Sequence, residues 1–228
     1  MWPAASSDLA PFQSLPPKLQ SLIIGGRKAA PRSRPYMVSL QHRGVHACGG
    51  ALMDRQWVLT AAHCLPQRTP LNRDCWGVRL SLFCSYLQLD KKVPRKIKTI
   101  SLSKKAPKPG TRCSVAGWGV HEQDGELSHV LRELDVAVMD IRMCNGSRFW
   151  NGEVFKNMIC IDVAQANSAP CSGDSGGPLV CGKRPSVYGV MSFSSQECVD
   201  KFKPPVTTSV FQYIKWIKET MRHLDFTQ

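Results

Sequence analysis

Long apolar segments are absent from this sequence of 228 residues. No stretch approaches the roughly 18 consecutive apolar residues of a membrane-spanning helix, so we expect no membrane span. Residues 1–22 contain four prolines and no apolar run of the length found in secretory signal peptides. We therefore expect residues 1–22 to form an N-terminal extension or pro-segment without a recognisable signal peptide.

Closely spaced Cys-x-x-Cys pairs, which many zinc sites use, are also missing. The ten cysteines are instead spread along the chain from Cys48 to Cys198. This distribution favours disulfides and hence an oxidising compartment. We expect neither a metal nor a cofactor.

Acidic residues are scarce. The chain has 17 aspartates and glutamates and 30 lysines and arginines, which gives a formal net charge of +13. One segment concentrates basic residues: Lys91, Lys92, Arg95, Lys96, Lys98, Lys104, Lys105 and Lys108. Such a cluster attracts anionic polymers such as sulfated glycans, but it is equally consistent with a solvated surface that maintains solubility. No zinc finger, helix-turn-helix or stacking-aromatic pattern accompanies the charge, so we expect no nucleic-acid binding.

Short segments rich in Val, Leu and Ile, separated by Gly, Pro and Ser, indicate an all-β protein. Three of them are residues 37–41, 57–62 and 187–193. Residues 210–224 differ, since apolar side chains recur there every three or four positions, as in an amphipathic helix. These side chains are Phe211, Ile214, Ile217 and Met221. We expect a C-terminal helix that docks this stripe on the core.

Three motifs carry the chemistry of the chain. They are Ile-Ile-Gly-Gly at residues 23–26, Thr-Ala-Ala-His-Cys at 60–64 and Ser-Gly-Asp-Ser-Gly-Gly-Pro at 172–178. With these motifs in this order, the chain resembles the trypsin-like serine proteases, and in particular their granzyme branch, from Ile23 to about Trp216. The resemblance implies two antiparallel Greek-key β-barrels and a C-terminal α-helix, with residues 23–228 as the protease domain.

The resemblance implies nucleophilic catalysis of peptide-bond hydrolysis. A serine hydroxyl is a poor nucleophile at neutral pH, so His63 would remove the proton of Ser175 and later deliver it to the leaving amine. The backbone N–H groups of Gly173 and Ser175 would form the oxyanion hole.

Activation by proteolysis is implied as well. In such proteases the amino group of the released N-terminus pairs with a buried aspartate, and the matching residues here are Ile23 and Asp174. Release would follow cleavage after Leu22, which argues against a trypsin-type activator. Because a buried ion pair needs both partners, we expect the pocket and oxyanion hole of the uncleaved chain to be disordered.

The resemblance also implies four disulfides, which would be Cys48–Cys64, Cys113–Cys181, Cys144–Cys160 and Cys171–Cys198. Two cysteines are left over, Cys75 and Cys84, and these are either free or paired with each other. Asn145 starts an N-glycosylation sequon, Asn-Gly-Ser, which is usable only in the secretory pathway.

The substrate pocket implied by the resemblance is narrow and uncharged. Ala169 would form its floor, with Pro170, Ser194 and Pro205 in its walls, which implies a preference for Met or Leu. An extended substrate would pair with the edge strand of Ser192, Phe193 and Ser194.

One part of the resemblance fails. The catalytic aspartate should start an Asp-Leu-Ala-Leu-Leu-Gln-Leu motif about 45 residues after the histidine. The matching piece here starts at Phe83, only 20 residues after His63. Roughly two dozen residues are absent on that spacing, which predicts missing strands in the N-terminal barrel. Asp74 and Asp90 are the remaining candidates for the carboxylate, and neither occupies the matching position.

Two functional hypotheses follow. The first is a secreted or granule-stored serine endopeptidase of the granzyme type, with protein or peptide substrates, serpin-type inhibitors and a role in cytotoxic killing. The second is a catalytically impaired relative, with Phe83 in place of the aspartate, that binds anionic glycans or proteins. Heparin affinity without proteolysis would distinguish them.

Overall fold

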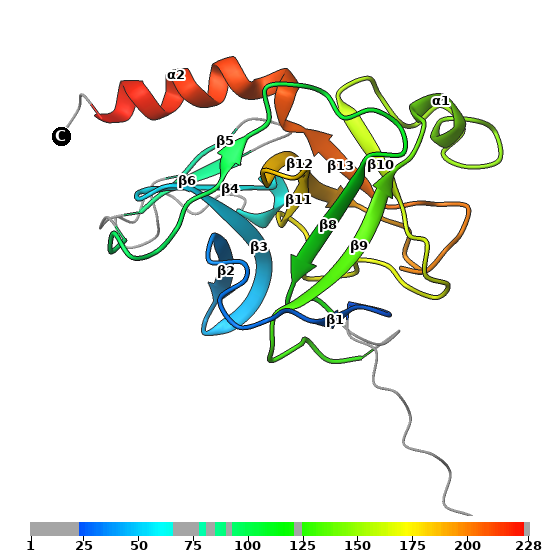
Figure 1. The fold of residues 1–228 in the computed structure, drawn as a ribbon, viewed down its shortest axis with the longest axis horizontal. Helices are drawn as coiled ribbons and strands as arrows, with labels where there is room; N and C mark the ends of the chain where they lie inside the picture. Colours follow the sequence, from blue (N-terminus) through cyan, green and yellow to red (C-terminus); the bar gives the residue numbers. More distant parts are fainter. Residues whose placement is uncertain (1–22, 66–77, 81–84, 90–92, 121–124, 226–228) are drawn as a thin grey trace, which may run out of the picture.

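The computed structural model describes residues 23–65, 78–80, 85–89, 93–120 and 125–225, and two β-sheets dominate it (Figure 1). This agrees with the all-β prediction. Among the described residues the helices are few, and none is long and apolar enough to cross a membrane.

The first sheet contains five strands in the order β2-β3-β4-β6-β5. Their bounds are β2 Met37–His42, β3 Val45–Asp54, β4 Trp57–Thr60, β5 Val78–Leu80 and β6 Ser85–Gln88. Within the ranges given above, no pairing joins β2 to β5, so these strands form an open sheet. The expectation of a reduced N-terminal barrel rests on the family spacing, and this open sheet is compatible with it.

The second sheet contains eight strands in the order β1-β9-β10-β13-β12-β11-β8, with β7 beside β12. Their bounds are β1 Arg27–Lys28, β7 Ser101–Leu102, β8 Arg112–Gly117, β9 Arg132–Val138, β10 Met158–Asp162, β11 Pro178–Cys181, β12 Ser186–Phe193 and β13 Val206–Ser209. A further pairing of β8 with β9 closes six of these strands into a barrel. The closed barrel confirms the second of the two barrels that the sequence predicts.

Side chains of β9 alternate between the barrel interior and the outside, as a strand with one buried face requires. Leu134 and Val136 are buried and join Val115 of β8 in the core, whereas Asp135 is exposed. Ile23 packs into the same core with no exposed surface. The start of the predicted protease domain is therefore built into the second barrel.

The predicted C-terminal helix is present, preceded by one 3₁₀ turn. The turn η2 spans Val210–Tyr213 and the helix α2 spans Ile214–Asp225. Ile217 is buried and Met221 packs against the same cluster, as expected. Phe211 was expected in the docking stripe, but it is 38% exposed. The expectation was wrong because a 3₁₀ turn has about three residues per turn, which displaces Phe211 from the α-helical stripe.

Four disulfides join the cysteine pairs that the family resemblance implies. They are Cys48–Cys64, Cys113–Cys181, Cys144–Cys160 and Cys171–Cys198. Cys75 and Cys84 lie outside the described residues. The remaining short helices are η1 Ala62–Cys64 and α1 Ile141–Cys144, so two of the disulfides fasten helical turns to strands.

Candidate active site

Ser175 lies in the tight loop that leads into β11. Two glycines of this loop adopt left-handed backbone conformations, Gly173 with φ of 94° and Gly176 with φ of 79°. A Cβ atom on Gly176 would lie 2.5 Å from the carbonyl oxygen of Gly49, so the site leaves no room for a side chain. The glycine-rich motif is therefore required to bring the serine backbone against the first sheet.

Backbone hydrogen bonds fix the loop on both sides. The amide of Gly49 in β3 donates to the carbonyl of Ser175 at 2.8 Å. On the other side, Gly176 donates to Met191 and Met191 donates to Gly177, both at 2.8 Å. The serine loop thus lies between the two sheets, and its backbone is hydrogen-bonded to both.

His63 occupies the 3₁₀ turn η1, directly after β4. Cys64 fastens this turn to Cys48 of β3 through a disulfide, and the Thr60 hydroxyl donates to the carbonyl of Gly49 at 2.8 Å. A Cβ on Gly176 would also collide with Thr60 Oγ1. The histidine turn and the serine loop therefore adjoin each other, although no hydrogen bond joins the two side chains in the part of the chain described.

The His63 side chain is exposed, yet neighbouring protein atoms displace part of its hydration and lower the pKa of its imidazole. Among the described residues, no carboxylate contributes to this pKa. A ring nitrogen lies within 4.8 Å of both sulfurs of Cys48 and Cys64. Those sulfurs form a disulfide, so this cluster offers no thiolates to a metal ion.

The aspartate that the family resemblance leads us to expect would lie in the chain just before β6. Ser85 is the first residue of β6 and pairs with Thr60, the last residue of β4. Thr60 lies three positions before His63 in the sequence. The sequence immediately before Ser85 is Phe83-Cys84. Phe83, Asp74 and Asp90 lie outside the described residues, so the predicted absence of the aspartate stays a prediction based on residue type.

Asp174 is almost completely buried, with 2% of its surface exposed. Its carboxylate accepts hydrogen bonds from the amides of Gly119 at 2.8 Å and Cys171 at 3.0 Å. Burial nevertheless raises the pKa of Asp174 to about 6, because these two bonds offset only part of the desolvation. Of the described cations, none forms an ion pair with it.

The N-terminal segment of the domain lies close to the predicted substrate pocket. Ile24 forms a bridge with Ala169, whose amide donates to the Ile24 carbonyl at 2.9 Å. Ala169 is 2% exposed, and Pro170 and Pro205 are buried too. The segment that follows Ile23 therefore supports the residue predicted as the pocket floor.

Phe193 ends β12, and Ser194 follows it with a partly exposed side chain. The Phe193 ring packs edge-on against Trp150, with 5.2 Å between the ring centroids. The predicted substrate-binding edge thus continues into an aromatic wall.

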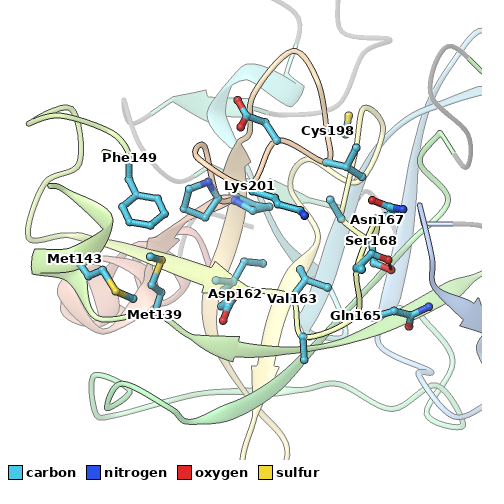
Figure 2. Close-up of a pocket in the computed structure, with 18 residues that line it drawn as sticks. Met139, Met143, Phe149, Asp162, Val163, Gln165, Asn167, Ser168, Cys198 and Lys201 are labelled. Carbon is cyan, nitrogen blue, oxygen red and sulfur yellow. Dashed lines mark hydrogen bonds between the residues drawn. The ribbon is translucent and has the colours of Figure 1, made fainter. Parts of the chain in front are cut away.

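A cavity of about 470 Å³ adjoins the predicted pocket floor, Ala169 (Figure 2). Ala169, Pro205 and Cys198 line it, whereas Ser175 and His63 do not. Figure 2 shows Met139, Met143 and Phe149 at one end and Gln165, Asn167 and Ser168 at the other. The two predicted catalytic side chains therefore do not line this cavity.

One residue that binds the Ser175 loop was not predicted from the sequence. His46 of β3 bonds through Nε2 to the Gly173 carbonyl at 2.8 Å and through Nδ1 to the Ser39 hydroxyl at 2.8 Å. Because a carbonyl only accepts, Nε2 carries the proton and Nδ1 accepts from Ser39. The ring also contacts Trp118, with 5.6 Å between ring centroids. No local motif marks this histidine, since its partner lies 127 residues away.

Comparisons with known proteins agree with this architecture. The trypsin family model matches residues 23–80 and 84–217. Among solved structures, neuropsin, a serine protease expressed in the limbic system of mouse brain, superposes with a TM-score of 0.75 at 28% identity, over 86% of this chain and 98% of that one. The chain therefore belongs to the trypsin family of serine proteases.

Within this family the chain is similar to granzyme M. Granzyme M of Homo sapiens is 48% identical over 226 residues, which cover 86% of this chain and 88% of that protein. Granzyme M of Rattus norvegicus is 42% identical over 235 residues, which cover 90% and 91% of the two chains.

Proposed function

We propose that this chain is a serine endopeptidase of the granzyme M type, which hydrolyses peptide bonds through an acyl-enzyme on Ser175. The observation that carries the proposal is the construction of the Ser175 loop. Its two left-handed glycines, its hydrogen bonds to both sheets and the adjoining turn of His63 form the framework that acyl transfer needs. His63 would act as the general base, and the amides of Gly173 and Ser175 would bind the oxyanion.

The proposed specificity is for Met or Leu before the scissile bond. Ala169 has no charge for a lysine or arginine side chain, and Pro170 and Pro205 narrow the space with apolar rings. An unbranched or γ-branched apolar side chain suits such a pocket. The substrate backbone would pair with Ser192, Phe193 and Ser194 by main-chain hydrogen bonds.

Residues 1–22 are proposed as a pro-segment and residues 23–228 as the protease domain. Cleavage after Leu22 would free the amino group of Ile23 to pair with Asp174, whose burial makes a nearby cation strongly favourable. Storage in secretory granules or secretion, cytotoxic function, serpin-type inhibitors and a glycan on Asn145 belong to the same proposal. Asn145 is partly exposed while its Oδ1 accepts from the Val154 amide at 2.9 Å, which leaves its Nδ2 as the attachment atom.

Peptide hydrolysis by the cleaved protein tests the proposal. Substrates that differ only in Leu, Met, Phe or Arg before the scissile bond should be cut in the order Leu and Met before Phe, with Arg last. Ser175→Ala should abolish all cleavage. Cleavage that survives Ser175→Ala, or that prefers Arg, would contradict the proposal.

A second candidate function is binding of anionic glycans without catalysis. It is favoured by Phe83 at the sequence position where the family has its aspartate, and by the exposed cations Arg95, Lys96, Lys98, Lys104, Lys105 and Lys108. Lys91 and Lys92 of the same segment lie outside the described residues. Replacing Lys96, Lys98 and Lys104 by Glu should then lower the salt concentration at which the protein leaves a heparin column. Replacing the exposed Lys215, Lys218 and Arg222 of α2 by Glu changes the net charge by the same amount and is the matched control.

A further inference from the structure

Arg132, the first residue of β9, is a buried cation without a hydrogen-bond partner for its Nε among the described residues. Only 4% of its surface is exposed. Burial lowers the pKa of its guanidinium, and no described carboxylate counteracts this effect. Buried charges are normally paired because desolvation without compensation is costly. The position of Arg132 therefore needs an explanation.

The carboxylates of β9 itself form no ion pair with Arg132. Glu133 and Asp135 point to the opposite side of the strand, as the alternation of side chains requires. Both are already bound to arginines, since Arg27 contacts Glu133 at 2.9 Å and Asp135 at 2.7 Å, and Arg34 contacts Glu133 at 2.9 Å. The partner of Arg132 has to lie on the inner face of the sheet.

The register of β8 and β9 places that inner face beside Asp174. Arg132 stands directly opposite Gly117, and residues directly opposite each other in a sheet project to the same face. A Cβ on Gly117 would lie 2.1 Å from Asp174 Oδ1. The side chain of Arg132 consequently leaves β9 on the same face as the buried carboxylate.

The side chain of Arg132 is long enough to reach from β9 to the carboxylate of Asp174. Cβ atoms of opposite residues in a sheet are about 4.5–5.5 Å apart, and the three-carbon stem of an arginine carries its guanidinium over such a span. Gly117, which lies between the two on this face, has no side chain to intervene. No ion pair joins Arg132 and Asp174 in the structure, so forming one requires a different rotamer of at least one of the two side chains.

In the uncleaved chain, none of the described cations forms an ion pair with Asp174 either. Its hydrogen-bond donors are the neutral amides of Gly119 and Cys171. The nitrogen of Ile23 is tied up in the peptide bond to Leu22 and has no charge to offer. Two opposite charges, each buried and each without an ionic partner among the described residues, therefore share one face of one barrel.

We propose that Arg132 is a positioning residue that acts as the counter-cation of Asp174 before cleavage and is displaced by the Ile23 ammonium afterwards. This inference rests on the proposed role of Asp174 as the partner of the released N-terminus. Through Asp174, Arg132 would hold the backbone of Gly173 and Ser175 in place. The uncleaved chain would then keep its oxyanion loop ordered, in contrast to the expectation from the sequence.

A double-mutant cycle performed before and after cleavage tests the proposal. An enteropeptidase sequence in place of residues 18–22 lets the same full chain be cut directly before Ile23. The variants are Arg132→Met, Asp174→Asn and their combination, with Arg132→Lys as the conservative replacement and Arg112→Met, an exposed arginine of β8, as the matched control. The measurements are the urea midpoint of unfolding and the hydrogen exchange of the loop amides at residues 173–177.

In the uncut chain, Arg132→Met should lower the urea midpoint and speed exchange of the loop amides. Both effects should vanish in the Asp174→Asn background, and Arg132→Lys should retain most of the wild-type protection. After the cut, Arg132→Met should leave hydrogen exchange of the loop amides nearly unchanged, because the Ile23 ammonium then pairs with Asp174. Arg112→Met should have no effect in either form.

Equal effects of Arg132→Met before and after the cut would overturn the proposal, and so would equal effects in the wild-type and Asp174→Asn backgrounds. Either result would leave Arg132 a structural residue only. If Arg132→Met does not fold, Arg132→Gln and Arg132→Lys give the same comparison. None of these measurements needs peptide hydrolysis. A chain that fails to cleave peptides but shows the coupling would contradict the proposed function and still support this role of Arg132.

Discussion

The Nε2 atom of His46 lies 2.8 Å from the carbonyl oxygen of Gly173. This bond ties β3 of the first sheet to the loop that carries Ser175 in the second barrel. Because Gly173 would supply one of the two oxyanion N–H groups, its orientation decides whether the loop can stabilise negative charge. His46 therefore links the two sheets at the point where the proposed chemistry takes place.

Replacing His46 by Ala should loosen this loop. We expect a loss of about 1–2 kcal/mol in the free energy of unfolding, because the Gly173 carbonyl and the Ser39 hydroxyl both lose a partner. Urea unfolding and amide exchange at residues 173–177 measure the change. Ser39→Ala should cost less, since it leaves the Nε2 bond in place, and His129→Ala at an exposed position should be neutral. A loop that exchanges as slowly in His46→Ala as in the wild type would contradict this role.

In the uncleaved Arg132→Met chain, which lacks the proposed counter-cation of Asp174, stability should fall as the pH rises from about 4 to about 6. Burial raises the pKa of Asp174 to about 6, whereas an aspartate in an unfolded chain titrates near 3.9. The folded chain therefore binds the proton more tightly, and this stabilisation is present at low pH and lost as the pH passes through the folded pKa. The contribution is about 3 kcal/mol.

Urea midpoints at several pH values measure this dependence. In the same Arg132→Met background, Asp174→Asn, which has no titrating group, should flatten the curve between about pH 4 and 6. Cutting the chain before Ile23 should also remove the fall, because the ammonium of Ile23 stabilises the ionised carboxylate. An unchanged slope in Asp174→Asn would mean that another group is responsible.

Glu133 should matter more to stability than a surface acid. It joins Arg27 of β1 to Arg34 before β2, and its pair with Arg34 is largely shielded, with exposed side-chain fractions of 14% for Arg34 and 12% for Glu133. Glu133→Gln should therefore cost about 1–3 kcal/mol in unfolding free energy. Glu219→Gln, which breaks the exposed pair with Lys215, should cost less than about 0.5 kcal/mol. Equal costs would show that the Glu133 network is as weak as a surface pair.

A carboxylate at the predicted pocket floor should create affinity for a cation. Ala169→Asp is expected to bind benzamidine, a mimic of the arginine side chain, about 10- to 100-fold more tightly than the wild type, the range that one charged hydrogen bond provides. Fluorescence titration measures this binding without any need for turnover. Equal affinity of Ala169→Asp and wild type would place the pocket floor elsewhere.

Sequence patterns predicted the parts of this fold that depend on short stretches of chain. Residues 37–41 and 187–193 became β2 and β12 with shifts of one residue at one end. The helix expected over residues 210–224 is present as α2, but a 3₁₀ turn replaces its first turn. Residues 57–62 were predicted as one segment, but the strand ends at Thr60 because η1 starts at Ala62. Motif spacing and family resemblance supplied His63, Ser175 and the disulfide pairs.

Relationships between distant residues were out of reach of the sequence. The bond between His46 and Gly173 and the shared face of Arg132 and Asp174 depend on the register of strands from different parts of the chain. A histidine in a strand and an arginine in an alternating strand have ordinary local patterns. Only the three-dimensional pairing shows what each of them faces.

Reactivity of Ser175 toward a fluorophosphonate tests the central claim most directly. The claim is that the chain keeps the serine-protease framework but lacks the aspartate that orients His63. After the cut before Ile23, intact mass should show labelling at Ser175 that is slow, and Phe83→Asp should accelerate it by up to about ten-thousandfold. Ser175→Ala should prevent labelling. Fast labelling of the wild-type chain, unchanged by Phe83→Asp, would contradict the account, since some other group would then orient His63.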